Sequence, residues 1–71
     1  MSSWSKSVSD YLRELEETKD RREPQVKEGL EIYIELWRKA IERGVVSEGD
    51  QVDEALTKIE DKGGLYKAAE D

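Results

Sequence analysis

The chain has 71 residues, of which 42% are charged and 35% are hydrophobic, and its formal net charge is −6. It contains no Cys and no His, which excludes disulfides and the usual zinc sites, and removes the commonest general base and the thiol nucleophile of enzymes. We expect a single domain over residues 1–71, because a chain this short is near the lower limit for a core that folds unaided. Self-association is then the remaining way to enlarge the core.

The first predicted helix covers about residues 4–21. Its apolar side chains recur at helical spacing and form a stripe about 100° wide. The stripe consists of Trp4, Val8, Tyr11, Leu12 and Leu15. Ser7 followed by Asp10 fits a capping box in which Asp replaces Glu, whereas a cap at Ser3 or Ser5 would bring Trp4 into the helix.

The second predicted helix covers residues 24–43 and contains the ambiguous stretch LEIYIELW at residues 30–37. Strand-like alternation holds only for residues 31–36, whereas the helical pattern runs for about sixteen residues, so length favours a helix. Pro24 is suited to the first helical position, and Gly44 is a natural stop. The apolar face of this helix is about 200° wide, because Ile32 and Leu36 extend it on one side.

The third predicted helix covers residues 50–62, with Ser47 or Asp50 as its cap. A glycine pair ends it, and a left-handed Gly64 would let Leu65 fold back on Ile59, as in a Schellman stop. Residues 63–71 then form either a short terminal turn or a frayed tail.

These elements predict an all-α fold, a small three-helix bundle, with a helical hairpin completed by dimerisation as the alternative. In the bundle, the middle helix can pack against both neighbours, which would explain its wide apolar face. Ile32 and Leu36 are nevertheless the best candidates for contact with another chain, and Ala40, one turn later, would allow close approach. We therefore predict a homodimer rather than a monomer, formed about a two-fold axis.

No residue pattern in the chain predicts catalysis. Pairs of carboxylates such as Glu31 and Glu35 could in principle do acid–base work, but they are typical of a solvated helix face. The segment DQVDE lacks the spacing and the central glycine of a calcium loop, and there is no glycine-rich phosphate loop. We predict that the protein is not an enzyme and has no metal site and no cofactor.

Negative charge is concentrated in the last third of the chain. Residues 47–71 carry eight Asp and Glu side chains against three Lys, whereas residues 1–46 are nearly neutral. This excess argues against direct binding of DNA or RNA. It suggests instead an acidic surface that could imitate a phosphate backbone. That surface would consist of Asp50, Asp53, Glu54, Glu60 and Asp61.

The sequence thus predicts a non-catalytic protein–protein interaction module, a small acidic adaptor or accessory subunit of a larger complex. The alternative is an acidic nucleic-acid mimic that occupies the basic cleft of a nucleic-acid-binding protein. The opening segment has no apolar run typical of a signal peptide, and no stretch approaches membrane-spanning length. We expect a cytoplasmic protein that does not enter membranes and whose partner is another protein.

Overall fold

The computed structural model describes residues 6–70 and confirms the all-α prediction. The described chain forms four helices, α1 (Val8–Asp20), α2 (Pro24–Glu42), α3 (Val52–Asp61) and α4 (Leu65–Ala69). Within these residues the only β-type pairing is an isolated antiparallel bridge between Ser7 and Gln51. Trp4 of the predicted first stripe lies outside the described residues.

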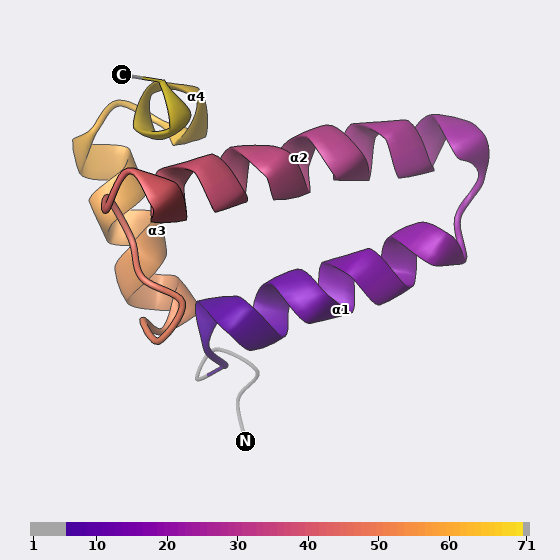
Figure 1. The fold of residues 1–71 in the computed structure, drawn as a ribbon, viewed down its shortest axis with the longest axis horizontal. Helices are drawn as coiled ribbons and strands as arrows, with labels where there is room; N and C mark the ends of the chain where they lie inside the picture. Colours follow the sequence, from indigo (N-terminus) through magenta and orange to yellow (C-terminus); the bar gives the residue numbers. More distant parts are fainter. Residues whose placement is uncertain (1–5, 71) are drawn as a thin grey trace.

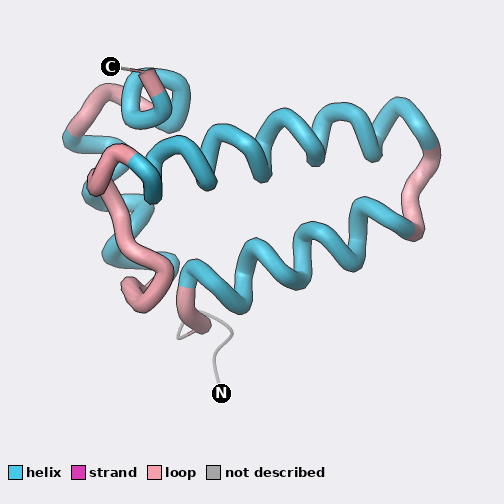
Figure 2. Tube along the Cα trace, in the orientation of Figure 1, coloured by secondary structure: helices cyan, strands magenta, loops and turns pink. Residues whose placement is uncertain are grey.

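The two long helices α1 and α2 form an antiparallel hairpin, and the other two helices gather at one end of it (Figure 1). Helix α3 crosses this end, where α1 begins and α2 ends, and α4 packs against α2 (Figure 2). The opposite end, at the loop between α1 and α2, extends away from α3 and α4. The Cα atoms span 33 × 32 × 16 Å, so the molecule is flat.

Helix α2 begins where the sequence predicts, whereas α1 begins at Val8 and not near residue 4, so Ser7 is its cap among the serines considered. Ser7 is the N-cap of α1, and its hydroxyl accepts a hydrogen bond from the Asp10 N–H at 3.3 Å, which confirms the capping pair. Pro24 occupies the first turn of α2, where its missing N–H leaves no donor unsatisfied.

Glycines end α2 and α3 in Schellman motifs. Gly44 has φ +84° and follows α2, where the Val45 N–H donates to the Ala40 carbonyl at 3.0 Å. After α3 the left-handed residue of the motif is Gly63, with φ +100°. The N–H of Gly64 donates to the Ile59 carbonyl at 3.0 Å, so Gly64 is at position C″ of the motif and Gly63, not Gly64 as predicted, is at position C′.

The start of α3 differs from the prediction. Gln51 is its N-cap residue, and no side chain caps it, so the predicted caps Ser47 and Asp50 are wrong. The loop before α3 is instead tied to α1. The N–H groups of Val8 and Ser9, unsatisfied within their own helix, donate to the carbonyls of Asp50 and Glu48 at 2.9 and 3.1 Å.

The hydrophobic core lies at the end of the hairpin where α3 and α4 meet it. Trp37 is fully buried at its centre, and the rings of Tyr11 and Tyr33 meet the indole edge-on at centroid distances of 5.8 and 6.5 Å. The buried core side chains are Val8, Leu12, Ile34, Trp37, Ala40, Val46, Val52, Ala55, Ile59 and Ala68. At the far end of the hairpin Val26 is 45% exposed, because no other helix reaches it.

The short helix α4 covers part of α2 that we expected α3 to cover. Helix α2 makes its close contacts with α1 and α4, whereas α3 contacts α1 and α4. Ala68 of α4 is buried in the same cluster as Ala40, and Leu65 packs against this cluster from the side. Helix α4 (Leu65–Ala69) is therefore part of the fold, and the middle helix does not pack along both sequence neighbours.

Candidate functional site

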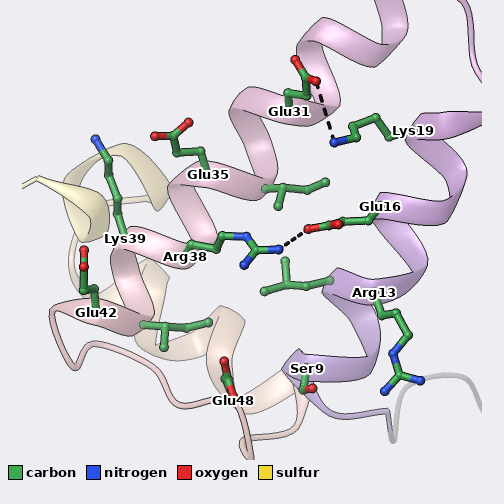
Figure 3. A pocket seen from close by; sticks show the side chains of 13 residues that line it. Ser9, Arg13, Glu16, Lys19, Glu31, Glu35, Arg38, Lys39, Glu42 and Glu48 are labelled. Atoms are coloured by element: carbon green, nitrogen blue, oxygen red, sulfur yellow. Dashed lines mark hydrogen bonds and ion pairs between the residues drawn. The ribbon is translucent and has the colours of Figure 1, made fainter.

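A groove of about 890 Å³ lies between α1 and α2 (Figure 3). Leu12, Ile34 and Ile41 supply its apolar lining, and its sides are lined by charged side chains of both helices together with Glu48 from the loop before α3. These are Arg13, Glu16, Lys19, Glu31, Glu35, Arg38, Lys39, Glu42 and Glu48. The two signs are nearly balanced, so the groove has no strong preference for a charged ligand.

Two ion pairs join the walls of this groove. Arg38 of α2 donates to the carboxylate of Glu16 on α1, and the Lys19 Nζ lies 3.8 Å from Glu31 Oε2 (Figure 3). The carboxylates of Glu16 and Glu31 are thus occupied in bracing the hairpin. Because exposed pairs of this kind each contribute about 0–1 kcal/mol, they fix the register of α1 against α2 more than they stabilise the fold.

A hydrogen bond between two tyrosines also joins α1 and α2, beside the core. The hydroxyls of Tyr11 and Tyr33 lie 3.1 Å apart, and one donates to the other. Burial raises the pKa of Tyr11 well above its ordinary value of 10.0, and the hydrogen bond to Tyr33 raises it further. The hydroxyl therefore stays protonated above pH 10.0, where an ordinary tyrosine ionises, and continues to hold the two helices together there. Sequence reasoning placed both residues on apolar faces but had no signal for their pairing.

A strip on the outer side of α2 remains uncovered. Gly29, Ile32 and Leu36 lie within about 60° of one another around the helix. Ile32 is 56% exposed and Leu36 is half-buried. A Cβ built on Gly29 would meet nothing within 4 Å, so the backbone is open to approach there. We call Gly29, Ile32 and Leu36 the α2 strip.

Ala40, the third residue predicted to contact a partner, is fully buried. Helix α4 packs against α2 at this end, and the Nε of Arg43, the C-cap residue of α2, donates to the carbonyl of Glu70, just after α4. Ala40 is therefore unavailable to another chain in this fold. The exposed part of α2 ends between Leu36 and Ala40, where α4 packs against the helix. Sequence periodicity alone could not show that boundary.

The predicted acidic surface is only partly assembled. Four of its members are exposed and lie within about 120° of one another on α3, opposite the buried Val52, Ala55 and Ile59. These four are Asp53, Glu54, Glu60 and Asp61. The fifth residue, Asp50, precedes the helix and has structural partners of its own.

Asp50 holds the loop in front of α3. Its Oδ2 accepts hydrogen bonds from the Lys58 Nζ at 2.8 Å and from the Ser47 N–H at 3.0 Å. The bond from Lys58, followed by that from Ser47, lowers the pKa of Asp50, and the same contact raises the pKa of Lys58. The charge of Asp50 is therefore neutralised locally, and the exposed acidic face consists of the four residues on α3.

The described residues contain neither a metal-binding cluster nor a membrane-spanning helix. Among residues 6–70 no three His, Cys, Asp or Glu side chains are grouped so that they could hold a metal ion. None of the helices in this part of the chain is long and apolar enough to cross a membrane.

Comparison with known proteins identified no relative. No protein-family model, no curated protein and no solved structure matches the chain. The residues and their geometry are therefore the basis for any functional proposal.

Proposed function

We propose that this protein is a non-catalytic protein–protein interaction module, a small acidic adaptor or accessory subunit that acts in the cytoplasm. The α2 strip is its docking surface. The observation that carries the proposal is the 56% exposure of Ile32 on a long helix braced by α1. Full burial of an isoleucine is worth about 1.5–3 kcal/mol, so burial by a partner of the exposed 56% of Ile32 would contribute about 1–1.5 kcal/mol, or about a 10-fold change in affinity.

The test is affinity capture from the native host with matched variants of the full chain. Ile32→Glu places a charge in the α2 strip, whereas Leu56→Glu places the same charge on α3, where Leu56 is 44% exposed. We expect wild type and Leu56→Glu to retain one partner, and Ile32→Glu to lose it while keeping its helical circular dichroism. A partner retained equally by all three proteins would contradict the proposal.

Self-association through the same strip remains a prediction. A homodimer formed by two α2 helices would bury Ile32 of both copies. Sedimentation of the wild type at tens of micromolar and of Ile32→Glu tests it, because a dimer of this kind dissociates in the variant. A monomeric wild type would refute the homodimer and leave docking of another protein intact.

The second candidate function is nucleic-acid mimicry, and the acidic face of α3 favours it. Asp53, Glu54, Glu60 and Asp61 share one exposed face, as a surface that imitates phosphates requires. This function predicts a basic, nucleic-acid-binding partner whose affinity falls steeply with added salt. Asp53→Asn combined with Glu60→Gln would weaken such a complex, whereas Ile32→Glu would leave it unchanged.

A further inference from the structure

We infer that the partner segment fitting the α2 strip is a basic amphipathic helix of another protein. This inference rests on the proposed function and identifies the chemistry of its partner. The shape of the strip favours a helix, the charges beside it favour lysine and arginine, and the same charges disfavour a second copy of this chain.

The shape follows from what lies at each end of the strip. From Gln25 to Leu36 the outer side of α2 is about 18 Å long, or about three helical turns. Helix α4 closes one end, where Ala40 is buried, and the other end is open at the loop between α1 and α2. Because Gly29 has no side chain and faces open space, a second helix can approach there to about 8–10 Å between axes.

The charges beside the strip are predominantly negative. Glu28 and Glu35 are exposed, and helical spacing places both on the same side of Ile32. Figure 3 shows the carboxylate of Glu35 directed away from α1, at the edge of the groove that Glu35 helps to line. Neither carboxylate forms an ion pair with any residue between 6 and 70. Lys39 lies on this side too, but farther along, at the end that α4 closes.

These charges select the occupant. Lysine or arginine beside an apolar seam can pair with Glu28 and Glu35 while their aliphatic stems extend the apolar contact. In a two-fold antiparallel pair confined to the part of α2 that α4 leaves free, Glu35 of one copy faces Glu28 of the other. Like charges brought together in this way oppose association. The net charge of −6 on each chain adds to that repulsion.

The probe is a synthetic amphipathic peptide of about four helical turns, with leucines along one face and lysines on both sides of them. A matched peptide carries glutamates in place of the lysines. Each is titrated by calorimetry into the full chain, and the contact is mapped on the isotope-labelled protein by backbone chemical shifts. We expect the basic peptide to bind, with shifts along residues 25–36, and the acidic peptide to bind at least about 10-fold more weakly.

Variants test both parts of the inference. Ile32→Glu should reduce affinity for the basic peptide about 10-fold or more. Glu28→Gln combined with Glu35→Gln should reduce it about 3- to 10-fold and flatten its salt dependence. Leu56→Glu, on α3, should bind as wild type does.

Two results would overturn the inference. Equal binding of the two peptides, or shifts confined to α3, would show that the strip does not select a basic helix. A wild-type dimer that dissociates in Ile32→Glu and excludes the peptide would show that a second copy is the occupant. Equal binding of the two peptides along residues 25–36, or a dimer of this kind, leaves docking on α2 in place, whereas a natural partner captured equally by Ile32→Glu would refute the proposed function itself.

Discussion

Trp37 gives the sharpest test of the core, because its indole is fully buried and its Nε1 has no hydrogen-bond partner among residues 6–70. Replacement by alanine should cost about 3–5 kcal/mol, a large part of the roughly 4–10 kcal/mol that a chain of this length has in total. Replacement by phenylalanine should behave differently, because phenylalanine keeps a ring between Tyr11 and Tyr33 and has no polar atom to bury.

The expected cost of Trp37→Phe comes from two opposing terms. Phenylalanine is smaller by about 40 Å³, which at about 24 cal/mol per Å³ costs about 1 kcal/mol, with a similar loss of transfer free energy. Removal of the buried, unpaired N–H offsets this by about 1–3 kcal/mol. We therefore expect the free energy of unfolding to change by no more than about 1 kcal/mol.

Urea unfolding followed by far-ultraviolet circular dichroism measures this change without depending on the fluorescence that the substitution removes. The slope of the unfolding free energy against urea should be unchanged, because the folded state stays equally compact. Ile34→Val, at an ordinary buried position, serves as a reference and should cost about 0.5–1.5 kcal/mol. A cost above about 2.5 kcal/mol for Trp37→Phe would refute the reasoning, since it would show that the indole N–H contributes a favourable interaction.

Three further predictions concern pH and the backbone. Because the pKa of Tyr11 is raised in the folded state, its stabilising effect is complete below the ordinary pKa of 10.0 and is lost as the pH rises further. Tyr11→Phe removes the hydrogen bond to Tyr33 at every pH but should lose less stability than wild type does as the pH rises above 10.0, whereas Tyr66→Phe, with 69% of Tyr66 exposed, should follow wild type. The lowered pKa of Asp50 gives the opposite pH dependence, so the contribution of Asp50 to stability is lost as the pH falls through and below 3.8. On acidification the melting temperature of Asp50→Asn should therefore fall less than that of wild type. In thermal unfolding Gly29→Ala should stabilise the helix by about 0.5–1 kcal/mol, whereas Gly44→Ala should destabilise the protein by about 1 kcal/mol because φ there is +84°. Equal effects of the two substitutions would contradict a helical backbone at Gly29 and a left-handed one at Gly44.

Local features of the chain were sufficient to predict where α2 begins and ends, and to offer Ser7 as one of the possible caps of α1. The hydrogen bond from the Asp10 N–H to the Ser7 hydroxyl is local in sequence and needs no tertiary contact, and Pro24 and Gly44 act through their own backbone preferences. Helical spacing likewise brings Ile32 and Leu36 to one side of α2 without any tertiary contact.

The coverage of α2 was decided only by tertiary structure. Leu36 and Ala40 are one turn apart and similar in pattern, yet Leu36 is half-buried and Ala40 is fully buried, because α4 packs against one end of the helix. Helix α4 has five residues, too few to be stable alone, so it forms only where α2 and α3 hold it. Its position depends on contacts between residues distant in sequence, which periodicity does not encode. By itself the sequence determined which faces are apolar, and the tertiary structure determined which of them remain exposed.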